Sequence, residues 1–173
     1  FLQMTDFSAT GLILIMILMF IGGSSGSTAG GIKVATFGLL VAYTVARFRG
    51  NSQLNLWHRT IPRQSIDKAT AVVVASAGIV LIAGTVLLFT ETNGLSAQES
   101  HLKFIPVIFE TISAFCTVGL SLNFTDKLSD SGKLILVFVM LVGRVGAISV
   151  AMAISLRQKQ TDFSYAEENI MIG

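Results

Sequence analysis

The sequence is short of charged residues. Only 13% of its 173 residues are Asp, Glu, Lys or Arg, whereas 52% are hydrophobic. An ordinary soluble domain carries about 25% charged residues. The chain therefore has too little polar surface to cover itself in water, and an integral membrane protein is the better interpretation. The formal net charge of +2 also gives no reason to expect a nucleic-acid partner.

Cysteine and histidine are scarce too. The single cysteine, Cys116, excludes an intrachain disulfide framework. The two histidines, His58 and His101, lie in polar connections, and no cluster of metal ligands is visible. An apolar stretch begins soon after Phe1 without the basic segment of a signal peptide, so we expect a piece of a longer chain.

Apolar stretches are abundant. Residues 69–90 and 134–156 are long enough, as helices, to cross a hydrocarbon core of about 30 Å. Residues 8–21 and 32–46 are too short to cross alone, and the ten residues between them include five glycines and no bulky side chain. Irregular backbone at membrane depth must lie against protein or water. The pattern predicts one broken transmembrane helix, and the short stretch 104–115 predicts a re-entrant helix.

Basic residues give the orientation, because Lys and Arg mark the cytoplasmic side. The connection 47–68 holds five of them against one acid, and two more follow the last apolar stretch in the tail 157–173. We expect these two segments to be cytoplasmic, and the loops 91–103 and 122–133 to face outward. The protein is predicted to be multi-pass.

The re-entrant helix is followed by a candidate cation site. A helix that ends at mid-membrane points the negative end of its dipole toward the centre. The next residues, Thr117, Val118, Gly119 and Leu120, are predicted to run extended, so that their carbonyl oxygens replace the hydration shell of an ion. Gly119 gives this turn the backbone freedom it requires. The alternative is a hairpin that only fills a cavity.

The last apolar stretch contains Arg144 near its middle. A charge there costs about 2.5–3.5 kcal/mol on insertion scales, so it should face the bundle and find partners. We expect carbonyls of the glycine-rich break to accept its hydrogen bonds, which would make Arg144 the latch of a gate. The predicted gate loop comprises Gly22, Gly23, Ser24, Ser25, Gly26, Ser27, Thr28, Ala29, Gly30, Gly31 and Lys33.

Plainer interpretations stay open for these residues. Arg144 would also pair with carbonyls of a missing repeat, and the glycine run would also serve as a hinge without pore contact. Lys33 either lies at the cavity, where it would repel ions, or extends to the interface. Glu110 either accepts hydrogen bonds behind the predicted filter or lies near the outer interface.

The glycine-rich segment 22–33 and the segment 109–121 together resemble the bacterial Ktr/Trk and plant HKT superfamily of cation transporters, most closely the KtrB-type membrane subunit. The resemblance implies an all-α membrane protein with four span–pore-helix–span repeats around one pseudo-fourfold pore. Residues 69–156 would form the fourth repeat, and 1–46 would hold the broken helix of the third. At Cys116 a smaller residue such as glycine is expected, so this residue should tune packing behind the filter.

The resemblance also implies a function. We expect potassium uptake across a bacterial plasma membrane, selected by the Thr-Val-Gly filter and controlled by the gate loop. The transported ion would be K+, with Na+ left open as a coupling or a regulatory ion, and no covalent cofactor is expected. Expected partners are membrane lipid, a second copy in a homodimer, the remaining repeats of the subunit, and a cytosolic nucleotide-binding ring of the KtrA type near residues 47–68.

Three alternatives compete with this prediction. Residues 22–26 also fit a nucleophile elbow and residues 23–26 the pattern of an intramembrane serine protease, but neither histidine lies in a span to act as a base. A phosphate-binding loop at residues 26–31 fails because Ile32 precedes Lys33. A non-conducting membrane assembly subunit explains the spans but not the filter turn, the break and Arg144 together.

Overall fold

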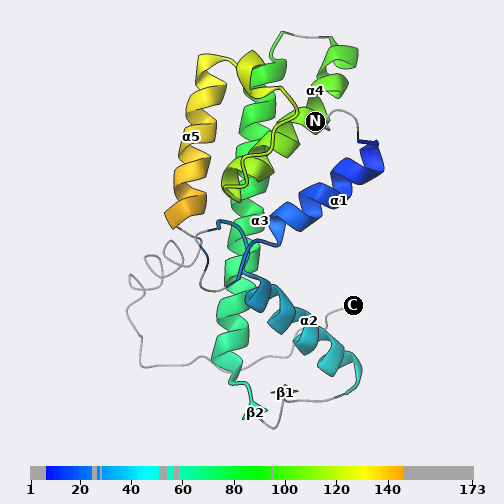
Figure 1. Ribbon diagram of the computed structural model, residues 1–173, viewed down its shortest axis with the longest axis vertical. Helices are drawn as coiled ribbons and strands as arrows, with labels where there is room; N and C mark the ends of the chain where they lie inside the picture. The colour runs from blue at the N-terminus through cyan, green and yellow to red at the C-terminus, as the bar shows by residue number, and fades with distance from the viewer. Residues whose placement is uncertain are drawn as a thin grey trace, which may run out of the picture.

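The computed structural model describes residues 7–24, 27, 29–50, 54–56, 59–94 and 96–145. This part of the chain is helical apart from one short antiparallel hairpin (Figure 1). The elements in chain order are α1 (Ala9–Phe20), α2 (Val34–Phe48), β1 (Asn55–Leu56), β2 (Arg59–Thr60), α3 (Arg63–Thr92), α4 (Ala97–Phe115), the 3-10 turn η2 (Thr125–Lys127) and α5 (Asp130–Val145).

Helix α3 forms the long axis of the molecule, with α2, α4 and α5 packed against it and α1 packed against α4 (Figure 1). Its 30 residues rise about 45 Å, and within the described residues it is the one helix long and apolar enough to cross a membrane. Only 17% of its most apolar window is buried, so α3 is not the enclosed core helix of a soluble protein. The helix begins at Arg63, so residues 63–68 extend this helix rather than the connection.

The predicted break in the first helix is present. Helices α1 and α2 are separate and run in different directions on either side of a loop (Figure 1). The loop is closed at its neck by backbone hydrogen bonds: the Gly22 N–H donates to the Ile32 carbonyl (2.7 Å) and the Ile32 N–H to the Phe20 carbonyl (3.2 Å). Some of the backbone groups released at the break thus find partners across the neck of the loop, as groups away from water must.

Helix α4 is longer than the predicted stretch 104–115. It begins at Ala97, after a capping box in which Ser96 and Glu99 bond each other's backbone N–H groups. The Ser96 hydroxyl and then its backbone N–H, both donating to Glu99, hold the pKa of that carboxyl below its ordinary value. The first turns of α4 carry charged residues, so a prediction based on apolar stretches does not include them. Pro106 lies inside α4, where it removes one backbone hydrogen bond, and α4 changes direction along its length (Figure 1).

Helix α4 ends about halfway along α3, and the chain then returns to the end where α4 began (Figure 1). We call residues 117–129 the return segment. Helix α5 starts there and runs back beside α3 and α4. The buried Glu91 carboxylate ties this start to the end of α3, because it accepts bonds from the Ser129 N–H (3.0 Å) and hydroxyl (2.6 Å). The remainder of the predicted last span, 146–156, and the tail 157–173 lie outside the described residues.

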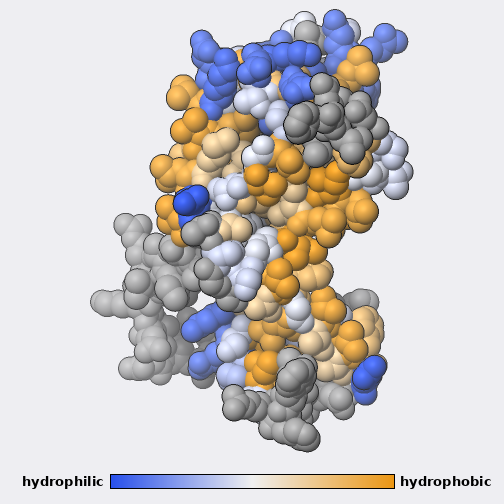
Figure 2. Space-filling view, in the orientation of Figure 1, coloured by the Kyte–Doolittle hydropathy of each residue, from blue (hydrophilic) through white to orange (hydrophobic). Residues whose placement is uncertain are grey.

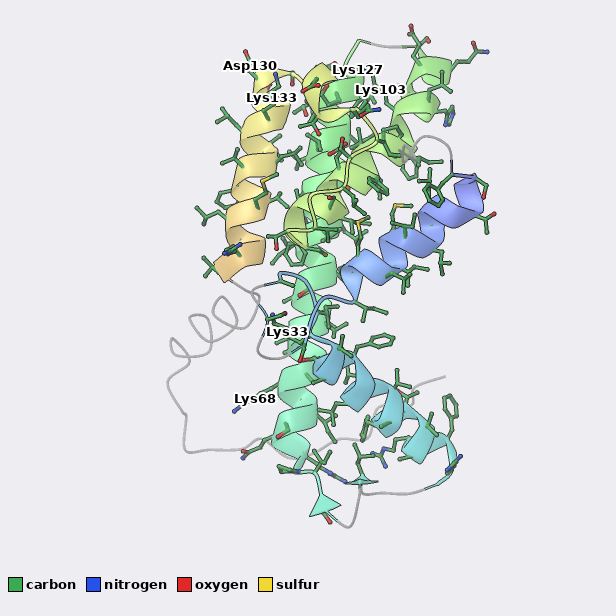
Figure 3. The ribbon with its side chains drawn as sticks, viewed as in Figure 1. Lys33, Lys68, Lys103, Lys127, Asp130 and Lys133 are labelled. Atoms are coloured by element: carbon green, nitrogen blue, oxygen red, sulfur yellow. The ribbon has the colours of Figure 1, made fainter. Side chains whose placement is uncertain are left out.

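The core lies where α3, α4 and α5 meet, around Leu87, Val107, Phe115, Leu136 and Val139. The outer faces remain apolar, and Figure 2 shows hydrophobic residues across the middle of the molecule with polar residues gathered at one end. Lys127, Asp130 and Lys133 lie at that end (Figure 3). A protein surrounded by water would expose mainly polar residues on these faces, so the apolar surface agrees with a lipid environment.

Candidate functional site

The turn after α4 has an unusual backbone. Thr117 and Gly119 both adopt left-handed conformations, with φ of 54° and 84°. The Thr117 and Val118 N–H groups donate back to the Ala114 (3.1 Å) and Ser113 (3.0 Å) carbonyls and so close the helix end. Left-handed backbone is uncommon for a β-branched residue such as threonine and marks a constrained site.

The carbonyl oxygens of this turn fall into two groups. Within the described part of the chain, those of Thr117, Val118 and Gly119 accept no hydrogen bond. The Leu120 carbonyl accepts a bond from the Ser113 hydroxyl at 2.6 Å. The predicted filter turn, residues 117–120, thus has three unpaired acceptors followed by one that is tied to α4.

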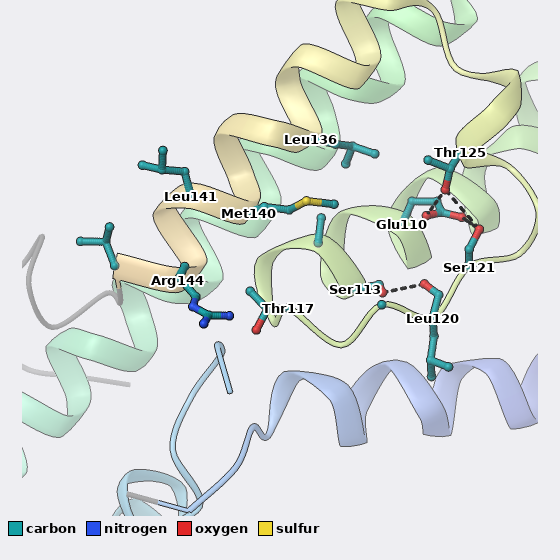
Figure 4. Close-up of a pocket in the computed structure, with 13 residues that line it drawn as sticks. Glu110, Ser113, Thr117, Leu120, Ser121, Thr125, Leu136, Met140, Leu141 and Arg144 are labelled. Atoms are coloured by element: carbon teal, nitrogen blue, oxygen red, sulfur yellow. Dashed lines mark hydrogen bonds between the residues drawn. The ribbon is translucent and has the colours of Figure 1, made fainter. Parts of the chain in front are cut away.

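Glu110 lies one helical turn before the end of α4 and is 5% exposed. Its carboxylate accepts hydrogen bonds from the Ser121 hydroxyl, the Leu122 N–H (3.1 Å) and the Thr125 hydroxyl (2.9 Å) (Figure 4). Of the two interpretations left open for this residue, the geometry favours the first, because all three donors belong to the return segment. Three hydrogen bonds to one buried side chain thus fix the course of this segment.

Most of the predicted gate loop is described, while Ser25, Gly26 and Thr28 lie outside the described residues. Lys33 is the residue before α2, where a positive charge faces the positive end of the helix dipole. Its ammonium group donates to the Ala29 carbonyl (2.7 Å) and the Ser27 carbonyl (3.0 Å). Lys33 lies at mid-length of the molecule (Figure 3), and these bonds make it an internal brace of the loop.

The gate loop touches the end of α4 directly. The Gly30 N–H donates to the Thr117 hydroxyl oxygen at 3.0 Å. A Cβ at Gly30 would lie 2.8 Å from the Phe115 carbonyl oxygen, and one at Gly31, where φ is +75°, would lie 3.0 Å from the Cys116 sulfur. Both positions therefore require glycine. Cys116 is buried in the core, and its sulfur lies close to Gly31 of this loop; its predicted role in packing behind the filter stays a prediction.

Helix α5 approaches the same point from the other side. Gly143 packs so closely on the Phe115 carbonyl that a Cβ there would overlap it. The Arg144 side chain is directed from α5 toward Thr117 (Figure 4). It is exposed, and among the described residues no hydrogen bond or ion pair involves its guanidinium group. The loop contacts predicted for Arg144 are therefore absent from the described residues.

A cavity of about 650 Å³ lies between α5, the end of α4 and the return segment. Glu110 and Thr125 line one part of it, and Thr117 and Arg144 another (Figure 4). Its wall on the α5 side is apolar, with Leu136, Met140 and Leu141 among the lining residues. The structure thus gathers the turn, Glu110 and Arg144 around one space. Sequence analysis did not single out Ser113, whose hydroxyl donates to the Leu120 carbonyl. The small residue Gly143, next to Arg144, allows the close approach of α5 to Phe115.

Comparison with known proteins gives consistent matches along the chain. Residues 2–164 match the family described as TrkH, cation transport protein. The chain is 38% identical over 175 residues to the potassium/sodium uptake protein NtpJ of Enterococcus hirae, with 100% of this chain and 37% of that protein covered. It is 35% identical over 171 residues to the Ktr system potassium uptake protein B of Vibrio alginolyticus (99% and 35% covered). Against the Bacillus subtilis protein of the same name it is 33% identical over 162 residues (94% and 34%).

The chain thus spans about a third of the length of these relatives. The matches confirm the resemblance to the KtrB-type membrane subunit that was drawn from two short motifs. The family is described as cation transport proteins and the relatives are named uptake proteins, which argues against the serine-protease alternative.

Proposed function

The chain belongs to the TrkH family of cation transport proteins, and we propose from this that it forms part of a potassium uptake pathway. In this proposal the turn at residues 117–119 supplies one quarter of the constriction that selects the ion. The observation that carries it is a set of three carbonyl oxygens, at the end of a helix that stops halfway along α3, that accept no hydrogen bond from any of the described residues. The names of the relatives, which refer to potassium and to sodium, support K+ as the transported ion and leave Na+ as a second candidate.

The physical case begins with the end of α4. Its dipole places about half a negative charge at its C-terminus, and this end lies at mid-height rather than at a polar surface. Carbonyls without hydrogen-bond partners in such a place need another source of positive charge. A dehydrated alkali cation satisfies them, provided that equivalent turns from other repeats complete its coordination shell.

The surroundings of the turn hold it in one shape. Glu110 fixes the return segment by three hydrogen bonds, and Ser113 binds the Leu120 carbonyl. In the proposal Leu120 therefore ends the filter, and its carbonyl contributes less to ion binding than the three before it. Glu110 and Ser113 are positioning residues that do not touch the ion.

We further propose that residues 22–33 form a gate with Arg144 as its latch. The guanidinium group is directed toward the region where the loop meets Thr117 (Figure 4). A cation at this depth without partners is costly, by about 2.5–3.5 kcal/mol on insertion scales. Carbonyls of the gate loop or of the remaining repeats would satisfy it, so a bond between Arg144 and the loop would stabilise the closed arrangement.

The wider assembly follows from the same proposal. Residues 69–156 act as one span–pore-helix–span repeat, and the missing repeats complete the pore. The basic connection 47–68 and the tail 157–173 face the cytoplasm of a plasma membrane. The Ktr system names of the relatives support a regulatory partner, which we take to be a cytosolic nucleotide-binding ring, and a homodimer of pores.

The test is ion flux through the full-length protein in liposomes. We expect K+ uptake by liposomes that have K+ on both sides of the membrane, and less uptake when Na+ replaces K+. In the resting state, Arg144→Ala should carry more K+ than the parent protein. Flux of Arg144→Ala equal to that of the parent protein would contradict the latch. Absence of any cation flux from folded full-length protein would favour the non-conducting assembly subunit instead.

A further inference from the structure

One hydrogen bond joins the gate loop to the filter turn. Among the hydrogen bonds of the described residues, the bond from the Gly30 N–H to the Thr117 hydroxyl oxygen (3.0 Å) is the one that links these two segments, across 87 residues of sequence. The glycine contacts around Phe115 and Cys116 bring the two segments close enough for it. The bond is partly buried, so water replaces it poorly when it breaks.

Thr117 has a second role in the same place. Its own backbone is left-handed, with φ of 54°, although β-branched residues avoid this conformation. Its carbonyl is one of the three in the turn that accept no hydrogen bond from the part of the chain that the structure describes. The side chain that receives the loop's hydrogen bond therefore belongs to the residue with the most constrained backbone of the turn. Loss of the bond frees the side chain and allows the backbone, and with it the carbonyl, to change direction.

We propose that Thr117 is a positioning residue that couples the gate loop to the ion-binding turn. Closing the loop makes the bond to Gly30 and holds the Thr117 carbonyl in one orientation, while opening the loop breaks the bond and releases it. By linkage, an ion bound at the turn must in return change the equilibrium of the gate by the same factor. This inference rests on the proposed filter and gate, and adds that neither acts independently of the other.

The first test uses the hydroxyl. Thr117→Val keeps the shape of the side chain but leaves the Gly30 N–H without an acceptor, whereas Thr117→Ser keeps the acceptor. Thr85→Val is the matched control, because Thr85 is exposed on α3 and its hydroxyl binds only the Leu81 carbonyl of its own helix. We expect the resting K+ flux of the full-length protein to rise about tenfold in Thr117→Val, to rise much less in Thr117→Ser, and to stay at the parent level in Thr85→Val.

The second test measures the coupling itself, which a purely structural role would not affect. A cysteine at Ser27, an exposed residue of the gate loop, is modified with a thiol reagent in K+ and then in choline solution. The parent protein controls for reaction at Cys116, which is buried. We expect the rate at Ser27→Cys to differ about three- to tenfold between the two solutions, and this difference to vanish with Thr117→Val and return with Thr117→Ser.

The proposed function and the coupling through Thr117 are contradicted by different results. If the full-length protein carries no K+, the proposed function is wrong. If it carries K+ but Thr117→Val matches the parent in resting flux and keeps the K+ dependence at Ser27→Cys, the proposed pathway stands and the coupling through Thr117 is wrong.

Discussion

Gly119 offers the sharpest test of the filter turn, because a substitution there strains the backbone without creating a steric clash. Its φ is +84°, yet a Cβ built on it would meet no atom within 4 Å. Replacing it by alanine therefore creates strain but no collision. Gly94 has nearly the same φ, +83°, and the same open space, but it lies in the turn between α3 and α4. Gly119→Ala and Gly94→Ala therefore impose the same backbone strain at two different positions.

The size of the penalty follows from the left-handed conformation, which costs an L-residue about 1–2 kcal/mol. Gly119→Ala and Gly94→Ala should therefore lower the free energy of unfolding by similar amounts. Gly38→Ala gives the opposite reference, since Gly38 lies inside α2 with open space around it and alanine is favoured in a helix by about 1 kcal/mol. Thermal unfolding of the purified full-length protein in detergent measures all three.

Flux distinguishes the two strained variants. Alanine at position 119 escapes its strain by rotating toward negative φ, which redirects the adjacent carbonyl groups of the turn. If those carbonyls bind the ion, Gly119→Ala raises the K+ concentration for half-maximal flux about tenfold, equivalent to about 1.4 kcal/mol. Gly94→Ala leaves it unchanged. Equal K+ dependence in the two variants, with equal losses of stability, would refute the assignment of residues 117–119 to the ion pathway.

Two further predictions follow from the contacts around this turn. Glu110→Ala leaves the three donors of the return segment without their acceptor. We therefore expect it to lower the free energy of unfolding by about 2–4 kcal/mol and to weaken K+ selectivity. Glu110→Gln keeps an acceptor oxygen and should lose less of both in the same unfolding and ion-replacement assays. Gly143→Ala places a methyl group against the Phe115 carbonyl, so we expect α5 to be displaced at a cost of about 1–3 kcal/mol, with a change in resting flux. Gly78→Ala, at a helix position with open space, should show neither effect and is its control.

The positions of several helices along the chain could be predicted from the sequence. Apolar stretches separated by a glycine run and a polar connection gave the broken helix and α3, because both features depend on composition over ten or more residues. The start of α4 could not be found in this way, since its first turns carry Glu99 and Lys103 and have no apolar run. A capping box at Ser96 and Glu99 was the available local signal.

The contacts within the candidate site were less predictable. The turn at residues 117–120 and the gate loop were recognised from local motifs, but their hydrogen bond joins Gly30 to Thr117 across 87 positions. No local pattern reports on a contact of that kind. The same limit applies to the contact between Cys116 and Gly31, since burial alone does not say which neighbour a side chain faces.

The glycines of this region also bear on how a gate is able to move. Gly30 of the loop and Gly143 of α5 meet backbone atoms at the end of α4, and Gly31 of the loop meets the Cys116 side chain, so the loop contributes few side-chain atoms to this junction. Dispersion and apolar burial grow with the number of atoms in contact, and a junction made of glycine keeps that number small. In the proposed gate, the one directional hydrogen bond to Thr117 therefore contributes a large share of the free energy that keeps the loop closed. In such a junction, polar contacts hold the loop closed. The interaction of a single ion or a single arginine is then able to exceed their free energy.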